Sequence, residues 1–586
     1  MSGTLAASHP DNPPGWLRSA LRPNVLWLTA PGLLYILVFL LLPCVRLLSL
    51  SLLDVDAGTF TTSAYARLLH VGLYARVLST TFAVAFQVTA LCLLLGYPLA
   101  YWLARQPPRR QRMLTLLVLF PFWTSALVKN FTWLVLLGHN GIVANLLGAA
   151  GLPAPDLLFS RGTVVFGMTH TMLPLAVISM LPVMNQIDRN LPSAAATLGA
   201  SRAQAFWRVF FQLSMPGVAS AGLLVFIASL GFFITPALLG GPHDTLLGQL
   251  IIQQIMTLQN WQLAGAIASM LIASVLLTCL VYDRLFGLSA IAGGSTVKQR
   301  GRGTVRRFGM AIAARAAMLC DIAARALGPR SIDWLLPAYA WTLVLLLLLP
   351  ILAAIPMAFT SASFLSFPPP GLSLRWFADY ATSQVWVAAT LRSFGIGLVS
   401  GFLTLLLAAP AAYAVVKGSS RLGTVVFMLF VTPMVVPSIV IAVALFYLFA
   451  QIGLIATNLG IIIGHTVTGI PLAFVILLAV LRGYDWSLNQ AAATLGANRA
   501  RAMWRVTLPL VKGGIFAAFI FAFLNSFEEL TIALFVGGGL KTTLPRQMWD
   551  DVTLSVSPTL AAASVVVLLV VTSLFLLAEF LRQPQR

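Results

Sequence analysis

Long apolar runs separated by short polar segments dominate the chain. A run of about 20 apolar residues can cross the hydrocarbon core of a bilayer as one helix. Runs of this kind predict twelve membrane-spanning helices, six in each half of the chain. They lie near residues 25–50, 80–104, 113–138, 162–186, 216–240 and 263–287, and then near 334–358, 387–415, 423–450, 456–481, 512–537 and 558–581.

The distribution of Lys and Arg predicts which loops face the cytoplasm. Segment 104–112 carries four arginines, and segment 298–330 carries eight basic residues against Asp321 alone. Basic residues concentrate in cytoplasmic loops, so both segments are expected inside. The loops poor in Lys and Arg are expected outside, namely 54–75, 139–161, 241–262 and 360–386. Each half then has an even number of spans, and both chain termini are expected in the cytoplasm.

Composition agrees with an all-α polytopic membrane protein. Mean hydropathy is +0.92, and only 9% of residues are charged, which excludes an ordinary soluble domain. A net charge of +20 would suggest nucleic acid in a soluble protein, but these charges sit in short loops, so no nucleic-acid partner is predicted. The four cysteines are scattered without a metal-ligand spacing, so neither a disulfide framework nor a metal site is indicated.

One polar stretch occurs twice. Ser193–Val209 and Gln490–Val506 differ at only four of their 17 positions. Two other segments also recur: "GYPLAYWLAR" corresponds to "AAPAAYAVVK", and "NGIVANLLG" corresponds to "IGLIATNLG". The chain is therefore predicted to contain two parallel six-helix repeats, related by an axis along the membrane normal. Their predicted bounds are 1–290 and 334–586, with a basic cytoplasmic linker at 291–333. The linker stretch "MAIAARAAMLCDIAARALG" is compatible with a helix on the inner leaflet or with a plain connecting helix.

Each copy of the stretch predicts two short helices joined by a turn. Gly199 and Gly496 interrupt good helix formers, and glycine is unfavourable inside a helix. Ser201 and Asn498 follow and are suited to cap the second helix. Each copy is either an interfacial anchor or a docking element. The near-identity of the two copies favours a docking role, with two equivalent binding sites on a partner.

The pattern "AAATLGA" followed by "WRV" resembles the EAA loop of binding-protein-dependent ABC importer permeases, and the similarity covers both halves. This resemblance implies the type I ABC importer permease fold, an inner-membrane location and an extracytoplasmic solute-binding protein. It also implies a coupling helix that docks on a separate ATP-hydrolysing subunit, so two copies imply two ATPase subunits. The positions that match are Ser193, Ala194, Ala195, Gly199, Ala200, Gln490, Ala491, Ala492, Gly496 and Ala497.

The match departs from the family pattern where a Glu is usual, because Ser193 and Gln490 stand there. No ATP-hydrolysing motif is visible in the chain either. "GGGLKTT" at 537–543 lacks the Gly before Lys that a phosphate-binding loop needs, and it falls on the predicted outer side. The chain is therefore predicted not to be an enzyme, with ATP and Mg²⁺ on the partner subunit and no cofactor of its own. His170 and His465 are interpreted as buried, hydrogen-bonded side chains.

Charged residues within the spans are candidates for function because burying a charge in a membrane is costly. Glu528 and Glu529 lie within an apolar run, one turn after Asn525 and Ser526, and the first-half counterpart has no acid. One hypothesis is that they contact a cationic substrate, and the alternative is that one glutamate pairs with Lys129. Aromatic residues that could line the pathway by cation–π contacts, or simply pack, are Phe122, Trp123, Trp133, Phe232 and Phe233.

Four segments resemble the permeases of spermidine/putrescine importers. They are "FPFWTSALVKNFTW", "GFFITPALLGGPHD", "SFEELTIALFVGGG" and "TTLPRQMWDD". The first two resemble one permease of the pair and the last two the other, which implies a fused pair carrying a polyamine. Related permeases import ferric iron, opines, phosphonates or other small solutes. An ion-coupled secondary transporter and a purely structural membrane protein are the alternatives from other classes.

Overall fold

The computed structural model describes residues 25–53, 58–139, 141–149, 151, 153, 156–188, 190–286, 315, 318, 329–418, 420–539 and 541–582. Most of the predicted linker 291–333, including nearly all of its candidate helix, lies outside these ranges. So do the extreme chain ends, on which the predicted placement of the termini depends. Across the described ranges the regular elements are helices, with only isolated β-bridges beside them.

The first repeat begins with a span built from η1 (Val25–Thr29), α2 (Ala30–Ile36), η2 (Leu37–Leu41) and α3 (Leu42–Leu50). It continues through α4 (Ser63–His70), α5 (Gly72–Ala104), α6 (Pro108–Trp123), α7 (Ala126–Leu137), α8 (Ile142–Ala149), α9 (Arg161–Asn185), α10 (Asn190–Thr197) and α11 (Arg202–Ala205). It ends with η3 (Phe206–Phe210), α12 (Phe211–Leu230), α13 (Ile234–Leu239), η4 (Pro242–Asp244), α14 (Leu247–Met256) and α15 (Trp261–Phe286).

The second repeat follows nearly the same order. It contains α18 (Pro329–Ala358), α19 (Arg375–Thr382), α20 (Gln384–Lys417), α21 (Ser420–Val435), α22 (Ser438–Ile452), α23 (Asn458–Arg482), α24 (Ser487–Thr494) and α25 (Arg499–Ala502). It ends with η5 (Met503–Thr507), α26 (Leu508–Phe527), α27 (Thr531–Val536), α28 (Leu544–Leu554) and α29 (Pro558–Arg582). Eleven helices in the described ranges are long and apolar enough to span a membrane, or up to 12 if one bent pair counts as a span. The prediction of an all-α polytopic protein with about twelve spans is confirmed.

Four of the predicted apolar runs are each divided into two helices. In the first repeat, α6 ends before α7 at Thr124, and α12 ends before α13 at Gly231. In the second repeat, α21 and α22 meet at an angle of 93° before Pro437, and α26 ends before α27 at Glu528. Proline disfavours helical backbone at the residue before it, which accounts for the bend at Pro437. Hydropathy alone did not indicate these breaks.

The first spans are exchanged between the repeats. Helices α2 and α3 pack against α20, α21 and α22 of the second repeat, while α18 packs against α5, α6 and α7 of the first. Each contact is fixed by a tyrosine: the Tyr35 hydroxyl donates to the Ile463 carbonyl at 2.9 Å, and the Tyr339 hydroxyl donates to the Leu95 carbonyl at 2.7 Å. Each repeat therefore holds the first span of the other.

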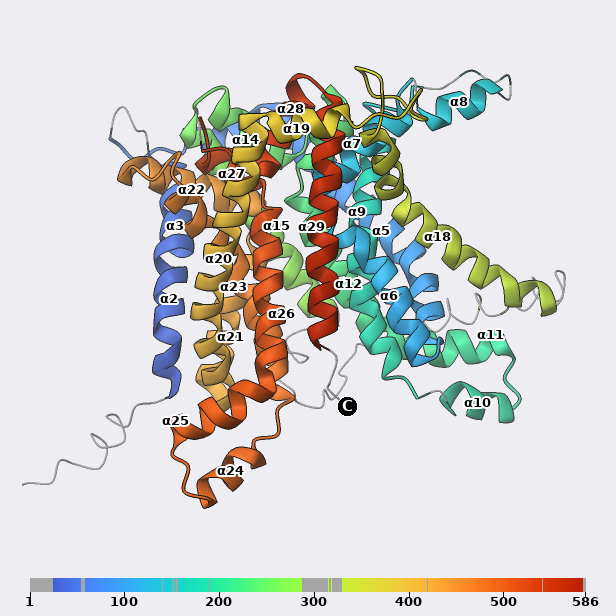
Figure 1. Cartoon of the computed structure of the whole chain (residues 1–586), viewed down its shortest axis with the longest axis vertical. Coiled ribbons are helices and arrows are strands. Elements are labelled where there is room, and N and C mark those ends of the chain that lie inside the picture. Colours follow the sequence, from blue (N-terminus) through green and yellow to red (C-terminus); the bar gives the residue numbers. More distant parts are fainter. Residues whose placement is uncertain are drawn as a thin grey trace, which may run out of the picture.

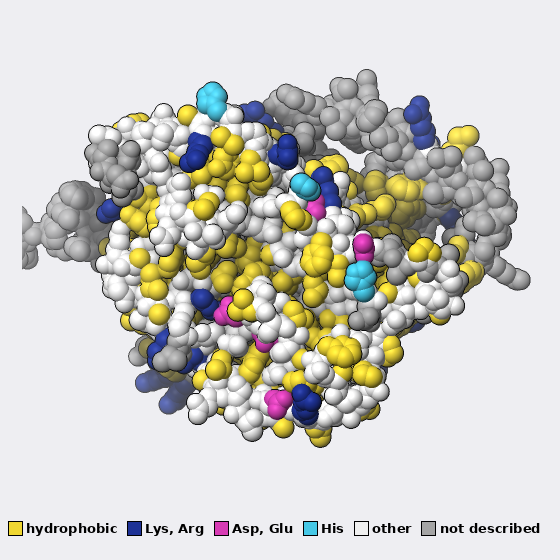
Figure 2. Space-filling model, turned by 90° about the horizontal axis from the view of Figure 1, so that it is seen from above, with side chains coloured by type: hydrophobic (Ala, Val, Ile, Leu, Met, Phe, Trp, Pro, Cys, Tyr) yellow, Lys and Arg dark blue, Asp and Glu magenta, His cyan; other side chains and the backbone are white. Residues whose placement is uncertain are grey.

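The two copies of the repeated stretch project from the same end of the molecule. Helices α10 and α11 lie at one side of this end and α24 and α25 at the other, while α8, α14 and α28 lie at the opposite end (Figure 1). Seen from that opposite end, acidic and basic side chains are few and scattered, and apolar side chains occupy much of the middle (Figure 2). This arrangement agrees with the predicted sidedness of the loops.

Candidate functional site

The helix breaks of the two repeats occupy equivalent sequence positions. Gly231 corresponds to Glu528 at the same offset, 297, that relates Gly199 to Gly496. Pro437 corresponds to Ser125 at the offset of 312 seen in the preceding spans. A Cβ atom added at Gly231 would lie 2.9 Å from the Pro437 Cβ, so one break of each repeat meets across the interface. The acidic candidates lie at the other break of the second repeat.

Glu529 caps the short buried helix α27. Its carboxylate accepts hydrogen bonds from the backbone N–H groups of Ile532, at 2.8 and 3.0 Å, and of Ala533, at 3.3 Å. A carboxylate at a helix N-terminus satisfies free N–H groups and opposes the positive end of the helix dipole. This arrangement explains why an acid is tolerated here, and it uses Glu529 for the structure of α27.

Arg546 caps the other end of α27. Its Nη1 donates to the carbonyls of Ala533 at 3.0 Å, Leu534 at 2.5 Å and Gly537 at 2.8 Å, and its Nε lies 3.8 Å from the Asp550 carboxylate. Burial lowers the pKa of Arg546 from its ordinary value, and the Asp550 charge opposes that shift. Burial likewise raises the pKa of Asp550, which the Arg546 charge opposes. Sequence reasoning missed Arg546, although a basic residue 17 positions after an acid in a span is visible in the sequence.

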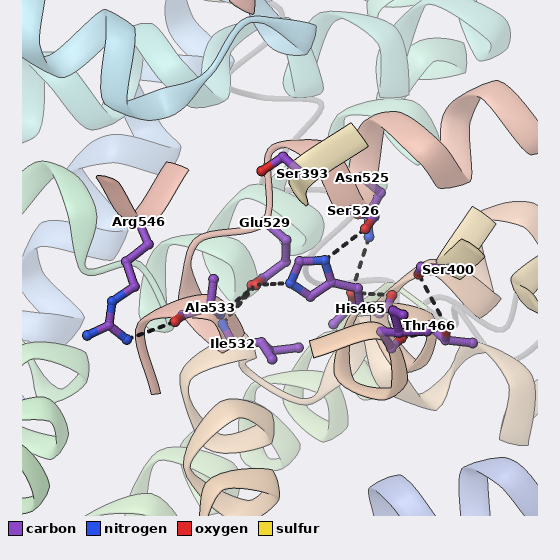
Figure 3. A network of polar contacts seen from close by, with 12 residues as sticks. Ser393, Ser400, His465, Thr466, Asn525, Ser526, Glu529, Ile532, Ala533 and Arg546 are labelled. Atoms are coloured by element: carbon purple, nitrogen blue, oxygen red, sulfur yellow. Dashed lines mark hydrogen bonds and ion pairs between the residues drawn. The ribbon is translucent and has the colours of Figure 1, made fainter. Parts of the chain in front are cut away.

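His465 connects Glu529 to the end of α26. Its Nδ1 lies 2.8 Å from the Ser526 hydroxyl and its Nε2 lies 3.4 Å from the Glu529 carboxylate, as Figure 3 shows. Asn525 donates to the Thr468 hydroxyl at 3.1 Å. His465, as predicted, is buried and hydrogen-bonded. Three of the four polar residues predicted around this break therefore have partners within the second repeat.

Glu528 is different, because its Oε1 is buried and has no hydrogen-bond partner among the described residues. Lys129 comes from the first turn of α7 in the other repeat and is 2% exposed. Its ammonium donates to the Pro121 carbonyl at 2.7 Å. The charges of Lys129 and Glu528 attract each other, but the two groups do not reach the distance of a direct ion pair. A buried carboxylate oxygen without a partner is costly, and among the four polar residues predicted around this break it is Glu528 that carries one.

Some of the predicted aromatic residues contact the second repeat, and others pack within the first. Trp123 lies at the end of α6 and packs on Phe521 of α26 with ring centroids 4.6 Å apart, so it joins the two repeats beside the break. Phe122 packs on Trp123, and Phe233 packs on Trp549 of α28. Trp133 instead packs on Phe166 and His170 within the first repeat, and Phe232 is partly buried.

The repeated stretch has the predicted geometry in both copies. Gly199 and Gly496 adopt left-handed backbone, with φ of 85° and 82°. The Ser201 hydroxyl accepts from the Gln204 N–H at 3.1 Å, and the Asn498 side chain accepts from the Arg501 N–H at 2.8 Å, so the predicted caps are confirmed.

Both copies are also preceded by an Asp that closes a turn, which sequence reasoning missed. Asp188 accepts from the Asn190 N–H at 2.9 Å, and Asp485 accepts from the Ser487 N–H at 3.0 Å. Hydrogen bonds from Ser487 hold the pKa of Asp485 below its ordinary value. An Asp at this position is typical of such a turn, so both turns could have been predicted from the sequence.

The two turns expose the same surface. In the first copy Ser193, Ala194 and Gly199 are exposed, while Ala195 and Ala200 are partly buried. In the second copy the equivalent residues Gln490, Ala491 and Gly496 are exposed, while Ala492 and Ala497 are partly buried. The residue before each glycine is a leucine with almost no cover, Leu198 at 89% exposure and Leu495 at 88%. The same large apolar side chain is therefore exposed at the same position of both copies.

The described residues hold no group of three or more His, Cys, Asp or Glu side chains placed to bind a metal ion. The fold and these sites define a transmembrane pathway protein with two pseudo-equivalent halves and two matching projections at one end.

Residues 96–290 and 401–584 both match the family described as the binding-protein-dependent transport system inner membrane component, and the chain belongs to this family. It is therefore two permease repeats fused in one chain, a non-catalytic, multi-pass inner-membrane subunit of an ABC importer that works with a binding protein. An ion-coupled secondary transporter is excluded by this membership.

Individual relatives cover less than half of the chain. The spermidine/putrescine transport system permease protein PotB of Haemophilus influenzae is 32% identical over 257 residues, which are 43% of this chain and 90% of that protein. PotB of Escherichia coli K12 is 31% identical over 43% of this chain and 93% of its own length. The molybdenum transport system permease protein ModB of Mycobacterium tuberculosis is 38% identical over 25% of this chain and 54% of its own length.

Among solved structures, a bacterial alginate ABC transporter in complex with an alginate pentasaccharide-bound periplasmic protein has a TM-score of 0.37 and 17% identity. The similarity covers 46% of this chain and 93% of that chain.

Proposed function

We propose that this permease carries a small organic cation of the polyamine type, such as spermidine or putrescine, delivered by an extracytoplasmic binding protein. The observation that carries the proposal is the buried Glu528 Oε1, which has no hydrogen-bond partner in the described part of the chain and lies at a helix break. A substrate ammonium would supply the missing charge and hydrogen bond. The similarity to spermidine/putrescine permeases over 90% of their length supports the same substrate class.

The surroundings of Glu528 support a cation as well. Asn525, Ser526 and Glu529 are held by contacts within the second repeat, so they position the Glu528 backbone rather than compete for a ligand. Trp123 of the other repeat packs on Phe521, which precedes Glu528 by seven residues along α26, and aromatic faces attract organic cations. The buried Lys129 is the group that would favour an anion such as molybdate, so the test includes an anionic solute.

For coupling, we propose that α10 and α24 each dock on one of two ATPase subunits, which bind ATP and Mg²⁺. Leu198 and Leu495 would insert into two equivalent apolar sockets, with the glycine turns fixing the shape. This end of the molecule would then face the cytoplasm together with both chain termini, and lipids would surround the spans. No nucleic-acid partner is proposed.

Substrate class is tested by the ATPase activity of the reconstituted complex. Candidate binding proteins are supplied loaded with spermidine, putrescine, ferric iron or molybdate. Stimulation by a polyamine-loaded protein is expected, and Glu528→Gln is expected to abolish it. The matched control is Asp379→Asn, which removes an exposed acid on α19. Stimulation by molybdate alone, unchanged in Glu528→Gln, would contradict the proposal.

Coupling is tested with Leu198→Ser and Leu495→Ser. Each is expected to weaken co-purification of the ATPase subunits, and the double variant is expected to lose ATP-driven uptake. Leu554→Ser is the control, because Leu554 is 85% exposed at the opposite end of the molecule. Wild-type uptake in the double variant would rule out these leucines as the docking contacts.

A further inference from the structure

The two pseudo-equivalent junctions between helix breaks have opposite chemistry. At one, Gly231 leaves no room for a side chain because Pro437 of the other repeat fills the space. At the other, glutamate stands at the Gly231 position and serine at the Pro437 position, as Glu528 and Ser125. Lys129 follows Ser125 by one helical turn. One junction is therefore filled by the Pro437 ring, while the other contains the Glu528 carboxylate and the Lys129 ammonium.

The place of Lys129 is not explained by the stability of its own helix. A positive charge in the first turn of a helix is unfavourable, because it faces the positive end of the helix dipole. Its ammonium reaches back to the Pro121 carbonyl near the end of α6. An ammonium has three donors, and this carbonyl is the one hydrogen-bond acceptor recorded for it among the described residues.

The hydrogen bonding of Glu528 is also incomplete. A buried pair that serves structure alone gains most from direct contact with all its hydrogen bonds satisfied. Here Glu528 Oε1 has no hydrogen-bond partner within the described ranges, while Glu529 beside it accepts three backbone hydrogen bonds. Lys129 bonds the Pro121 carbonyl and does not come within the 4.0 Å of a direct ion pair with Glu528, so it leaves this carboxylate oxygen unblocked.

We propose that Lys129 is an internal counter-cation for Glu528 in the empty permease, and that a substrate ammonium becomes the direct partner of Glu528 during passage. The inference rests on the proposed cation transport. When the cation binds, Lys129 keeps its bond to Pro121. When the cation leaves, the Lys129 charge again compensates Glu528. Because a conducting site must release what it binds, an internal competitor prevents the buried carboxylate from trapping its substrate.

The test uses Lys129→Gln in the full permease–ATPase complex. Glutamine keeps an N–H donor for the Pro121 carbonyl and removes the charge, and Lys129→Arg is the charge-preserving control. Binding of radiolabelled spermidine is measured in detergent without the binding protein, and uptake is measured in vesicles. We expect Lys129→Gln to lower the Kd by about tenfold, in the range of ordinary coupling between two sites. Uptake turnover is expected to fall, and Lys129→Arg to resemble wild type.

The double variant Lys129→Gln/Glu528→Gln separates the possible failures. The gain in affinity is expected to disappear in it. If Glu528→Gln alone abolishes spermidine binding but Lys129→Gln brings no gain, the counter-cation role is overturned and cation transport stands. If Glu528→Gln binds and transports spermidine like wild type, the proposed function itself fails. A lowered thermal midpoint of Lys129→Gln with unchanged Kd would show that Lys129 only caps α6.

Discussion

Gly231 and Pro437 meet at the interface between the two repeats, where a Cβ on Gly231 would lie 2.9 Å from the Pro437 Cβ. Real Cβ atoms do not approach so closely, and the neighbouring atom belongs to a rigid proline ring. Glycine at 231 is therefore required by close packing of two helix breaks. At the equivalent positions Glu528 and Ser125 replace Gly231 and Pro437, so this junction carries a long acidic side chain and has no proline.

Gly231→Ala is expected to destabilise the permease. Overpacking of a buried contact costs about 1–3 kcal/mol, since the proline cannot move aside without shifting α22. The thermal unfolding midpoint in detergent should fall. Gly395→Ala is the matched control, because a Cβ there meets nothing within 4 Å, and alanine is favoured over glycine inside a helix. An unchanged midpoint for Gly231→Ala would show that this junction adapts.

The two glutamates should behave differently towards mutation. Glu529→Ala removes the cap of α27 and the contact with His465, and losing hydrogen bonds to a charged group costs about 1–3 kcal/mol. Glu528→Gln removes a charge whose Oε1 has no hydrogen-bond partner among the described residues, so the thermal midpoint should fall less than in Glu529→Ala. Equal losses of stability in both variants would refute this division of roles.

Arg546→Gln is expected to loosen α27. Glutamine stands at the equivalent first-repeat position, Gln249, and it cannot replace a guanidinium that reaches three carbonyls. Hydrogen exchange of residues 531–537 should become faster, whereas the equivalent segment of the first repeat should be unaffected. If α27 keeps its wild-type protection, its packing against α22 holds it without Arg546.

Gly199→Ala and Gly496→Ala should weaken coupling by straining the turn. Left-handed backbone costs a residue with a Cβ about 1–2 kcal/mol, and no steric contact would oppose the added methyl group itself. Reduced ATPase binding with unchanged levels of protein in the membrane is expected. Gly72→Ala is the control, because Gly72 also has open space around its Cβ but lies outside the left-handed region. Full ATPase binding by both turn variants would mean that the turn shape is not read by the partner.

The spans, the repeats and the turns at Gly199 and Gly496 could be predicted because they depend on local patterns of apolar residues, identity and helix caps. The different uses of Glu528 and Glu529 could not, because the cap at Glu529 exists only where α27 begins again after a break. Hydropathy averages over a break of three residues, so 512–537 looked like one run. The exchange of the first spans depends on tertiary packing and leaves no periodic signal.

The exchange of first spans has a consequence for how such a transporter is made. Each first span packs against the other repeat as well as against α15 or α29 of its own, so a half synthesised alone would expose part of this packing surface. A pool of separate halves could also pair like with like, which would give two Gly231/Ser125 junctions or two Glu528/Pro437 junctions. Covalent fusion joins one first repeat to one second repeat. Every assembled permease therefore has one junction of each kind.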